Sequence, residues 1–175
     1  YDPKKARELL AKGGYPDGFE VEFDTPSGRY LLDREVSQAI AGQLSKVGIR
    51  AKVTVLEWGL FMKKFVGTHN LAPMALIGFG HRTADADGQY TFFSTESPYS
   101  YYSNKEVDDL LKEGRSTLDS GKRMEIYKKV SEILRDDAVI VFLYQQVDIY
   151  GVSEKFKWWK PRADENIWMF QFPPK

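Results

Sequence analysis

The segment Pro73–Gln89 reads PMALIGFGHRTADADGQ and joins two unlike halves. Its first half, Pro73–Phe79, is a nearly continuous apolar run that ends among glycines. Such a run is typical of a strand buried on both faces, as in a parallel sheet. The second half changes to imidazole, guanidinium, hydroxyl and carboxylate side chains. Because open α/β sheets bind ligands at the carboxyl ends of their strands, this pattern predicts a central strand followed by a ligand loop.

The residues before this segment predict a β-α-β-α-β order. Phe19–Phe23 and Ile49–Val55 alternate apolar and polar residues, as strands with one wet face do. Between them, Leu31–Val47 has apolar residues every fourth position and predicts an amphipathic helix. A strand, a helix and a strand in this order predict a parallel pair. Glu57–Phe65 predicts a short helix whose aromatic side is buried, with Lys63-Lys64 on its solvated face.

The residues after the loop predict helices and one more strand. Ser103 and Glu106 have capping-box spacing at the start of one helix, and Asp119 or Ser120 caps the next. The inward side of that second helix is predicted to consist of Met124, Tyr127, Val130, Ile133 and Leu134. Val139–Tyr144 is fully apolar and predicts a strand. The remaining chain is irregular and rich in aromatic residues, as expected of a segment that covers a sheet edge or docks elsewhere.

The composition narrows the class of protein. A chain of 175 residues suits one domain, or one large lobe of a bigger protein. Lys and Arg total 25, as do Asp and Glu, so no net field favours nucleic acid or a membrane surface. The absence of cysteine excludes disulfides, thiol nucleophiles and cysteine metal sites. No apolar run approaches the ~18 residues of a membrane span. The start at Tyr1, without Met or a signal peptide, is expected of an excised piece.

The motifs favour binding over catalysis. Neither His69 nor His81 has metal-site spacing, and no serine-hydrolase elbow, dinucleotide fingerprint or phosphate loop is present in the sequence. Asp85 and Asp87 fit two roles, as an acid–base pair or as caps of a short helix over Gly88–Phe93. Arg82 offers a planar fork for a carboxylate, and either aspartate complements an ammonium group. A zwitterionic ligand would use both charges; the alternative for Arg82 is an internal pair with one of the aspartates.

Several segments occur in a recognisable order along the chain: Tyr1–Ala6 with Leu9-Leu10, Gly14–Phe19, Gln43-Leu44 with Gly48-Ile49, Tyr102–Leu111, and Asp119 with Arg123, Tyr127 and Ile133–Asp137. This order resembles the C-terminal lobe of family 5 extracellular solute-binding proteins, the peptide, nickel and glutathione receptors of ABC importers. The resemblance covers the chain from Tyr1 to about Tyr150.

The resemblance implies the type II periplasmic-binding fold: a lobe with a mixed, mostly parallel sheet and flanking helices, in a receptor that closes by a hinge. Residues 1–175 would form a single C-terminal lobe, and the N-terminal lobe would be missing. No catalysis and no cofactor are implied. The implied partners are a small-molecule or peptide ligand and ABC permease subunits, with no nucleic acid. The implied location is the periplasm, or the outer side of the cytoplasmic membrane as an anchored lipoprotein.

The ligand loop departs from the pattern of the peptide-binding members. Those members carry Trp-x-x-Asp after this strand, and here Phe79 and Arg82 stand at the two positions. The run Thr83–Asp87 looks closer to the glutathione receptors. The candidate ligand contacts are His81, Arg82, Thr83, Asp85, Asp87 and Gln89, with Trp58 and Tyr144 as apolar walls. A dipeptide, an oligopeptide or glutathione is the expected ligand. A nickel chelate or an oligosaccharide is the alternative ligand, and a hydrolytic lobe using Asp85 and Asp87 is the alternative function.

Overall fold

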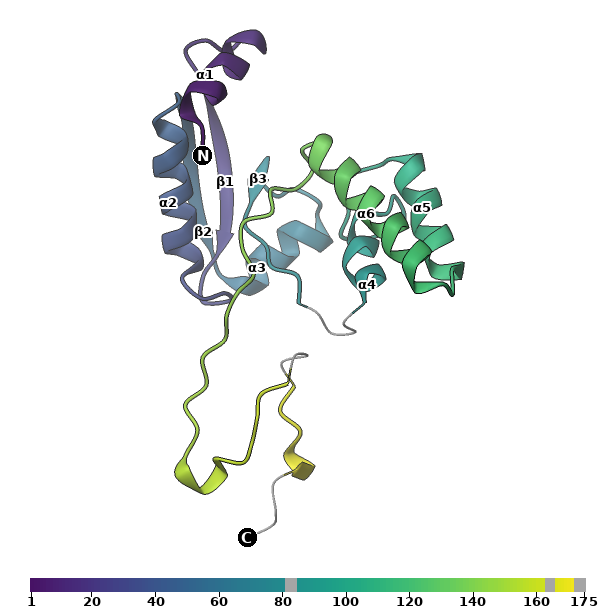
Figure 1. Ribbon diagram of the computed structural model, residues 1–175. Helices are drawn as coiled ribbons and strands as arrows, with labels where there is room; N and C mark the ends of the chain where they lie inside the picture. The colour runs from purple at the N-terminus through teal and green to yellow at the C-terminus, as the bar shows by residue number, and fades with distance from the viewer. Residues whose placement is uncertain (81–84, 163–165, 172–175) are drawn as a thin grey trace. The chain divides into compact units, whose positions relative to one another are not determined.

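A computed structural model describes residues 1–80, 85–162 and 166–171 of the chain (Figure 1). The chain divides into two compact units, Tyr1–Gly78 and Phe79–Lys175. The boundary lies between Gly78 and Phe79, at the end of the apolar run. Each unit has a hydrophobic cluster of its own, so each is described by itself.

The first unit is a small parallel α/β sheet with helices. Its elements are α1 (Pro3–Lys12), β1 (Phe19–Pro26), α2 (Asp33–Ser45), β2 (Ile49–Leu56), α3 (Trp58–Met62), a π-helical turn (Lys63–Gly67) and β3 (Met74–Ala75). β1 pairs with β2 from Phe19 opposite Ile49 to Pro26 opposite Leu56, and both pairings of β1 are parallel. The predicted β-α-β-α-β order and its parallel strands are therefore confirmed.

The predicted position of the third strand is wrong. In the described residues the strand order is β2-β1-β3, so β1 is central and β3 is an edge strand. Only Met74 and Ala75 pair with β1, and one further bond runs from the Leu76 amide to the Asp24 carbonyl. Leu76 is buried, although Ala75 is exposed. An apolar run indicates that a segment is buried, but helices can bury it as well as neighbouring strands. The run therefore does not distinguish a central strand from an edge strand.

The aromatic side of α3 forms the core of the first unit. Phe61 and Phe65 are buried with Leu56, and Trp58 and Met62 pack against them, as predicted. Lys64 does not lie on a solvated face, contrary to the prediction. Its ammonium group pairs with the carboxylate of Asp24, which is buried in β1. A buried carboxylate needs a partner, and the π-helical turn brings Lys64 to it.

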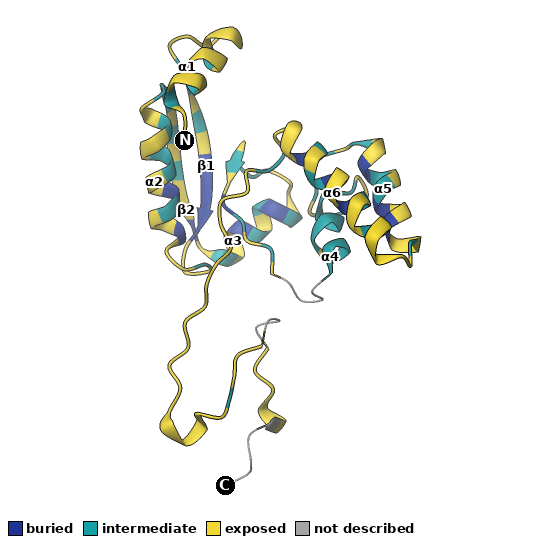
Figure 2. Ribbon diagram, viewed as in Figure 1, coloured by how far each residue is buried: buried dark blue, intermediate teal, exposed yellow. Residues whose placement is uncertain are grey.

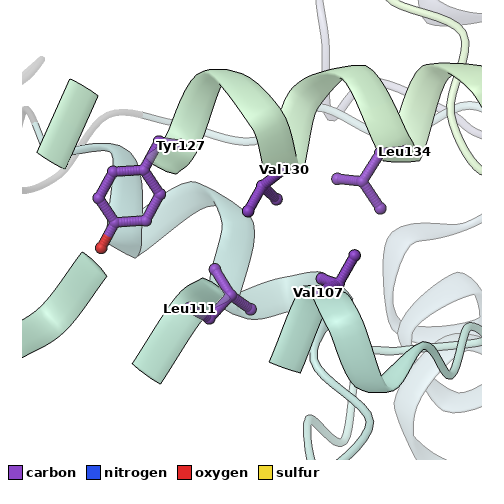
Figure 3. Packing of buried hydrophobic residues seen from close by; sticks show 5 residues of the cluster. All are labelled: Val107, Leu111, Tyr127, Val130 and Leu134. Atoms are coloured by element: carbon purple, nitrogen blue, oxygen red, sulfur yellow. The ribbon is translucent and has the colours of Figure 1, made fainter. Parts of the chain in front are cut away.

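In its described residues, the second unit consists mainly of two long helices and one short helix that packs against them. Its elements are α4 (Ala86–Tyr90), a 3₁₀ turn (Thr91–Phe93), α5 (Lys105–Ser116), α6 (Ser120–Asp136) and 3₁₀ turns at Glu154–Phe156 and Met169–Gln171. Figure 3 shows side chains of α6 facing side chains of α5 across their interface. The buried cluster consists of Val107, Leu111, Tyr127, Val130 and Leu134. Ile133 packs partly against it, but Met124 is exposed, so its predicted inward position is wrong.

The helix caps are partly as predicted. Asp2 accepts a hydrogen bond from the Lys5 amide at the start of α1, and Asp119 accepts one from the Lys122 amide at the start of α6. The cap of α5 is Asn104 and not Ser103. The Asn104 side chain accepts from the Glu106 and Val107 amides at 2.9 and 3.3 Å. Asparagine is as good a cap as serine, and it shifts the helix start by one residue.

The segment 140–152 does not form the predicted strand. It is extended without a strand partner in the described part of the chain, and Val141, Phe142 and Tyr144 are all more than half exposed. Figure 2 shows this segment coloured as exposed almost throughout. Its apolar composition favours a strand, but a strand needs a neighbour to take its backbone hydrogen bonds. The prediction of a strand at Val139–Tyr144 is therefore wrong for the chain as described here.

Candidate ligand-binding site

The carboxyl ends of the three parallel strands in the first unit lie at one edge of the sheet. Residues 27–32 follow β1, Glu57 and Trp58 follow β2, and residues 76–78 follow β3. The Tyr30 hydroxyl donates to the Gly78 carbonyl at 3.2 Å, which ties the first of these segments to the third. The Tyr30 ring lies so close that a Cβ at position 78 would come within 2.8 Å of it. This is the edge at which parallel α/β sheets usually hold ligands.

Asp33 holds the segment after β1 in shape. Its carboxylate accepts hydrogen bonds from the amides of Gly28, Arg29, Tyr30 and Arg34 at 2.9 to 3.2 Å. Burial alone would raise the pKa of Asp33, but the four amide donors outweigh it and lower that pKa. Leu32, just before α2, adopts a left-handed backbone with φ of 55°. Such strain persists only where the surroundings hold it in place, and Asp33 does so here.

Arg29 stands on this segment against two aromatic rings. Its guanidinium carbon lies 5.2 Å from the ring centre of Tyr30 and 5.2 Å from that of Trp58. The two rings meet edge to face, with their centres 6.2 Å apart. Burial raises the pKa of Tyr30, so its hydroxyl stays protonated and keeps donating to Gly78. The quadrupoles of the two rings therefore attract the guanidinium group and leave its N–H groups available.

Arg29 forms no ion pair or side-chain hydrogen bond with any of the described residues, although it is exposed. A guanidinium group offers a planar fork of donors that matches a carboxylate. An ordered, unpaired arginine at the ligand edge of a sheet is thus suited to an anionic ligand group. Arg29 is not among the ligand contacts predicted from the sequence. The available signal was its position directly after the turn that closes the first predicted strand; Trp58, a predicted apolar wall, follows two residues after β2.

The two aspartates of the ligand loop have partners inside the second unit. Asp85 caps α4 by accepting from the Asp87 amide at 2.8 Å. It also accepts from Arg123 of α6 through both carboxylate oxygens, at 2.6 and 2.8 Å. Asp87 accepts from Arg115 of α5 at 2.9 Å and from the Tyr127 hydroxyl at 3.3 Å. The capping role left open for Asp85 is thus observed, whereas Asp87 bonds to other helices.

The contact with Arg123 sets the charge state of Asp85. Hydrogen bonds from Arg123 are the main cause that lowers the pKa of Asp85, and the Asp87 amide adds to them. The same pair raises the pKa of Arg123 above its usual value. Asp85 is consequently ionised and paired at neutral pH. A general acid needs a protonated carboxyl group at working pH, so this geometry does not favour Asp85 as the acid of a hydrolase.

The other predicted contacts are distributed as follows. Gln89 of α4 donates from Nε2 to the Gly80 carbonyl at 2.5 Å. Trp58 belongs to the first unit, while Asp85, Asp87, Gln89 and Tyr144 belong to the second. Tyr144 lies in the extended segment 140–152 and is more than half exposed. His81, Arg82 and Thr83 lie outside the described residues.

Neither a metal-binding cluster nor a membrane-spanning helix occurs in the described ranges. They contain no cluster of three or more histidine or carboxylate side chains placed to hold a metal ion. None of the helices there has the length and apolarity that crossing a bilayer requires.

The chain is similar to known solute-binding proteins. The family described as "Bacterial extracellular solute-binding proteins, family 5 Middle" matches residues 1–101. The dipeptide-binding protein of Escherichia coli K12 is 32% identical over 90% of this chain and 31% of its own length. The glutathione-binding protein GsiB of Escherichia coli strain 536 is 34% identical over 77% of this chain and 28% of its own length.

A solved structure shows the same fold. The periplasmic binding protein DppA of Helicobacter pylori, in complex with the peptide STSA, superposes with a TM-score of 0.67 at 32% identity. That match covers 79% of this chain and 28% of the DppA chain. The α/β periplasmic-binding fold predicted from the sequence is thus confirmed. The chain spans about a third of the length of the relatives that it matches.

Proposed function

The chain belongs to the family 5 bacterial extracellular solute-binding proteins, and from that membership we propose that it is the C-terminal lobe of an ABC importer's receptor. Residues 1–175 form one ligand-binding lobe, and the ligand is held between this lobe and an N-terminal lobe of the same protein. The ligand is a small peptide-like or zwitterionic solute, such as a dipeptide, an oligopeptide or glutathione. The names of the relatives that bind dipeptides and glutathione support this class of ligand.

One observation carries the proposal: the guanidinium group of Arg29 is held by the rings of Tyr30 and Trp58 and has no carboxylate partner among the described residues. It binds a carboxylate of the ligand, and Trp58 serves as the apolar wall beside it. His81, Arg82 and Thr83 are further candidate contacts on the sequence pattern, and Gln89 and Tyr144 remain candidates beside them. When the lobes close, water is excluded and the charged contacts become stronger.

The alternatives are less well supported. An oligosaccharide needs no anchored cation, and Arg29 therefore favours an anionic ligand over a neutral sugar. A nickel chelate that carries carboxylates would also suit Arg29, so the choice between peptide and chelate falls to the binding measurement below. A hydrolytic lobe would need Asp85 or Asp87 to exchange protons with a substrate, and both carboxylates are engaged by arginines instead.

The partners and the location follow from the family. Its described members are extracellular, and the similar Helicobacter pylori protein is periplasmic and transporter-associated. The receptor acts outside the cytoplasmic membrane, in the periplasm or as an anchored lipoprotein, and delivers its ligand to ABC permease subunits. It returns the ligand chemically unchanged.

The proposal is tested by calorimetric titration of the complete receptor with the dipeptide Ala-Phe and with glutathione. Arg29→Ala is expected to weaken binding by ~1.5–3 kcal/mol, the range for hydrogen bonds to charged groups. Ala-Phe amide, which lacks the terminal carboxylate, is expected to bind the wild type and Arg29→Ala equally weakly. A thermal-shift screen of peptides, opines, sugars and metal chelates extends the ligand list.

Arg34→Ala is the matched control for this titration. Arg34 lies five residues further on, carries the same charge and is exposed on α2. It should leave the affinity unchanged, which separates a direct contact from a general change in charge. Equal loss of Ala-Phe binding in both variants, or no loss in Arg29→Ala, would remove Arg29 from the site.

A further inference from the structure

The two residues that border segment 81–84 are both tied to α4. The Gly80 carbonyl accepts from Gln89 at 2.5 Å, in the last turn of α4. Asp85 caps the first turn of the same helix. The ring of Phe79 packs against Phe92 with the ring centres 4.7 Å apart. The orientation of α4 therefore sets the positions of Gly80 and Asp85, the two residues that border the ligand loop.

Arg123 fixes α4 to the two long helices. Arg123 lies on α6 and donates hydrogen bonds to both carboxylate oxygens of Asp85. Its Nε donates at 2.9 Å to the carbonyl of Gly114 in α5. Its guanidinium carbon lies 4.9 Å from the ring centre of Tyr127. One side chain thus connects α4, α5 and α6. Only about a quarter of the Arg123 side chain is exposed, so this link is partly shielded from water.

Arg115 makes a second, independent link. From α5 its Nε donates to Asp87 at 2.9 Å, and a terminal nitrogen donates to the Thr91 hydroxyl at 2.8 Å. The Thr91 hydroxyl in turn donates to the Asp87 carbonyl at 2.6 Å. Tyr127 reaches both links, since its hydroxyl contacts Arg123 and Asp87 at 3.3 Å each. Two charged pairs therefore hold the first turn of α4, and a hydrogen bond from Arg115 holds Thr91, which follows the helix.

We infer that Arg123 and Arg115 are positioning residues of the receptor, which hold α4 and with it the ends of the ligand loop in the conformation that binds the ligand. The inference rests on the proposed function and gives Asp85 and Asp87 a role as anchors instead of contacts for a ligand ammonium group. Neither arginine touches the ligand. Loop ends held before binding reduce the conformational entropy that binding would otherwise cost.

The geometry of the pair requires arginine. A guanidinium group can bond both carboxylate oxygens and a carbonyl at once because its donors lie in one plane. A lysine at position 123 would keep the charge but could not make these three bonds together. Asparagine at position 85 would keep the helix cap and lose the charge pair. These two substitutions therefore separate positioning from charge and from capping.

The test measures hydrogen exchange by mass spectrometry in the ligand-free complete receptor. Arg123→Lys and Asp85→Asn are each expected to raise exchange in residues 85–93 about 10-fold, and the double variant should add little, because both act on one contact. Exchange in the facing core residues of α5 and α6 should stay unchanged. Arg135→Lys is the control, since Arg135 lies on the same helix, is exposed and pairs only with neighbouring Asp136 among the described residues.

The second measurement is the affinity for Ala-Phe and glutathione. Arg123→Lys should weaken both about 10-fold while the preference for Ala-Phe over its amide, set by Arg29, is retained. Unchanged exchange in residues 85–93, or local exchange without loss of affinity, would overturn the inference. So would faster exchange throughout α5 and α6, which would indicate a purely structural pair. A wild-type receptor that binds neither probe, with local exchange as expected, would count against the proposed ligand class and still support the anchoring of α4.

Discussion

At the scale of single residues, two carboxylates do opposite things from similar chemistry. Asp33 is buried, and its carboxylate accepts hydrogen bonds from four backbone amides. These bonds hold the segment that carries Arg29. Asp85 is more exposed and forms an ion pair with Arg123, which holds helix α4. Both have a lowered pKa, and in both the cause is donated hydrogen bonds that outweigh desolvation. Arg29 has no carboxylate partner among the described residues, which leaves its guanidinium group available for a ligand.

Asp33 should make the first unit sensitive to acid. Because the folded-state pKa lies below the usual value of 3.8, its stabilisation is full above that value and is lost as the pH falls through the lowered pKa. Asp33→Asn should therefore cost about 1–3 kcal/mol at pH 7, the range for losing charged hydrogen bonds in a buried position. The difference from wild type should shrink below pH 4 or so.

Hydrogen exchange of residues 19–47 in the complete receptor, at pH 7 and at pH 3, measures this difference. The control is Asp17→Asn, which changes the same group in an exposed turn. A destabilisation of equal size at both pH values would show that the Asp33 charge contributes nothing.

At the scale of elements, the contact of α5 with α6 depends on the absence of a side chain. Gly114 lies in α5 beneath the ring of Tyr127, and a Cβ there would come within 2.8 Å of the ring. The Gly114 carbonyl also accepts a hydrogen bond from Nε of Arg123. The close approach of the two helices at this point brings Tyr127 and Arg123 to α4. Helix propensity alone disfavours glycine here, so packing overrides it.

Alanine substitutions at two helical glycines should therefore differ in sign. Gly42→Ala in α2, where a Cβ would meet no atom within 4 Å, should stabilise the protein by about 0.5–1 kcal/mol through propensity. Gly114→Ala should destabilise by about 1–3 kcal/mol because it forces Tyr127 out of place. Thermal unfolding of the two variants under the same conditions measures the contrast. Stabilisation by both would mean that the Tyr127 ring moves aside freely.

At the scale of the whole molecule, much apolar surface is left uncovered. Residues 140–152 carry a row of exposed apolar side chains in an extended conformation (Figure 2). The relatives are about three times longer than this chain. In the proposed two-lobed receptor, we expect the rest of the protein to cover this segment and the proposed ligand edge of the sheet.

The isolated chain should accordingly bind ligand poorly. A ligand site normally buries most of its ligand, and one lobe offers only part of that burial. We expect affinity for Ala-Phe at least about 100-fold below that of the complete receptor. Calorimetric titration of both proteins measures it, with Arg29→Ala of the isolated chain as the blank. Sub-micromolar binding by the isolated chain would contradict the two-lobe proposal.

The sequence by itself determined the order and type of most elements, the parallel sheet and the family. These follow from local signals, such as the alternation in Phe19–Phe23, the caps at Asp2 and Asp119 and the breaks at glycines. Trp58 is a candidate apolar wall of the site on the sequence alone.

Only the tertiary structure decided which charges are free. Arg29, Arg115 and Arg123 are equivalent in the sequence, but their partners lie up to 38 residues away or on neighbouring rings. It also placed β1 at the centre of the sheet and gave Val139–Tyr144 no strand partner among the described residues. The reason is physical: a local pattern reports what a segment can bury, whereas pairing depends on which distant groups the fold brings within a few ångströms.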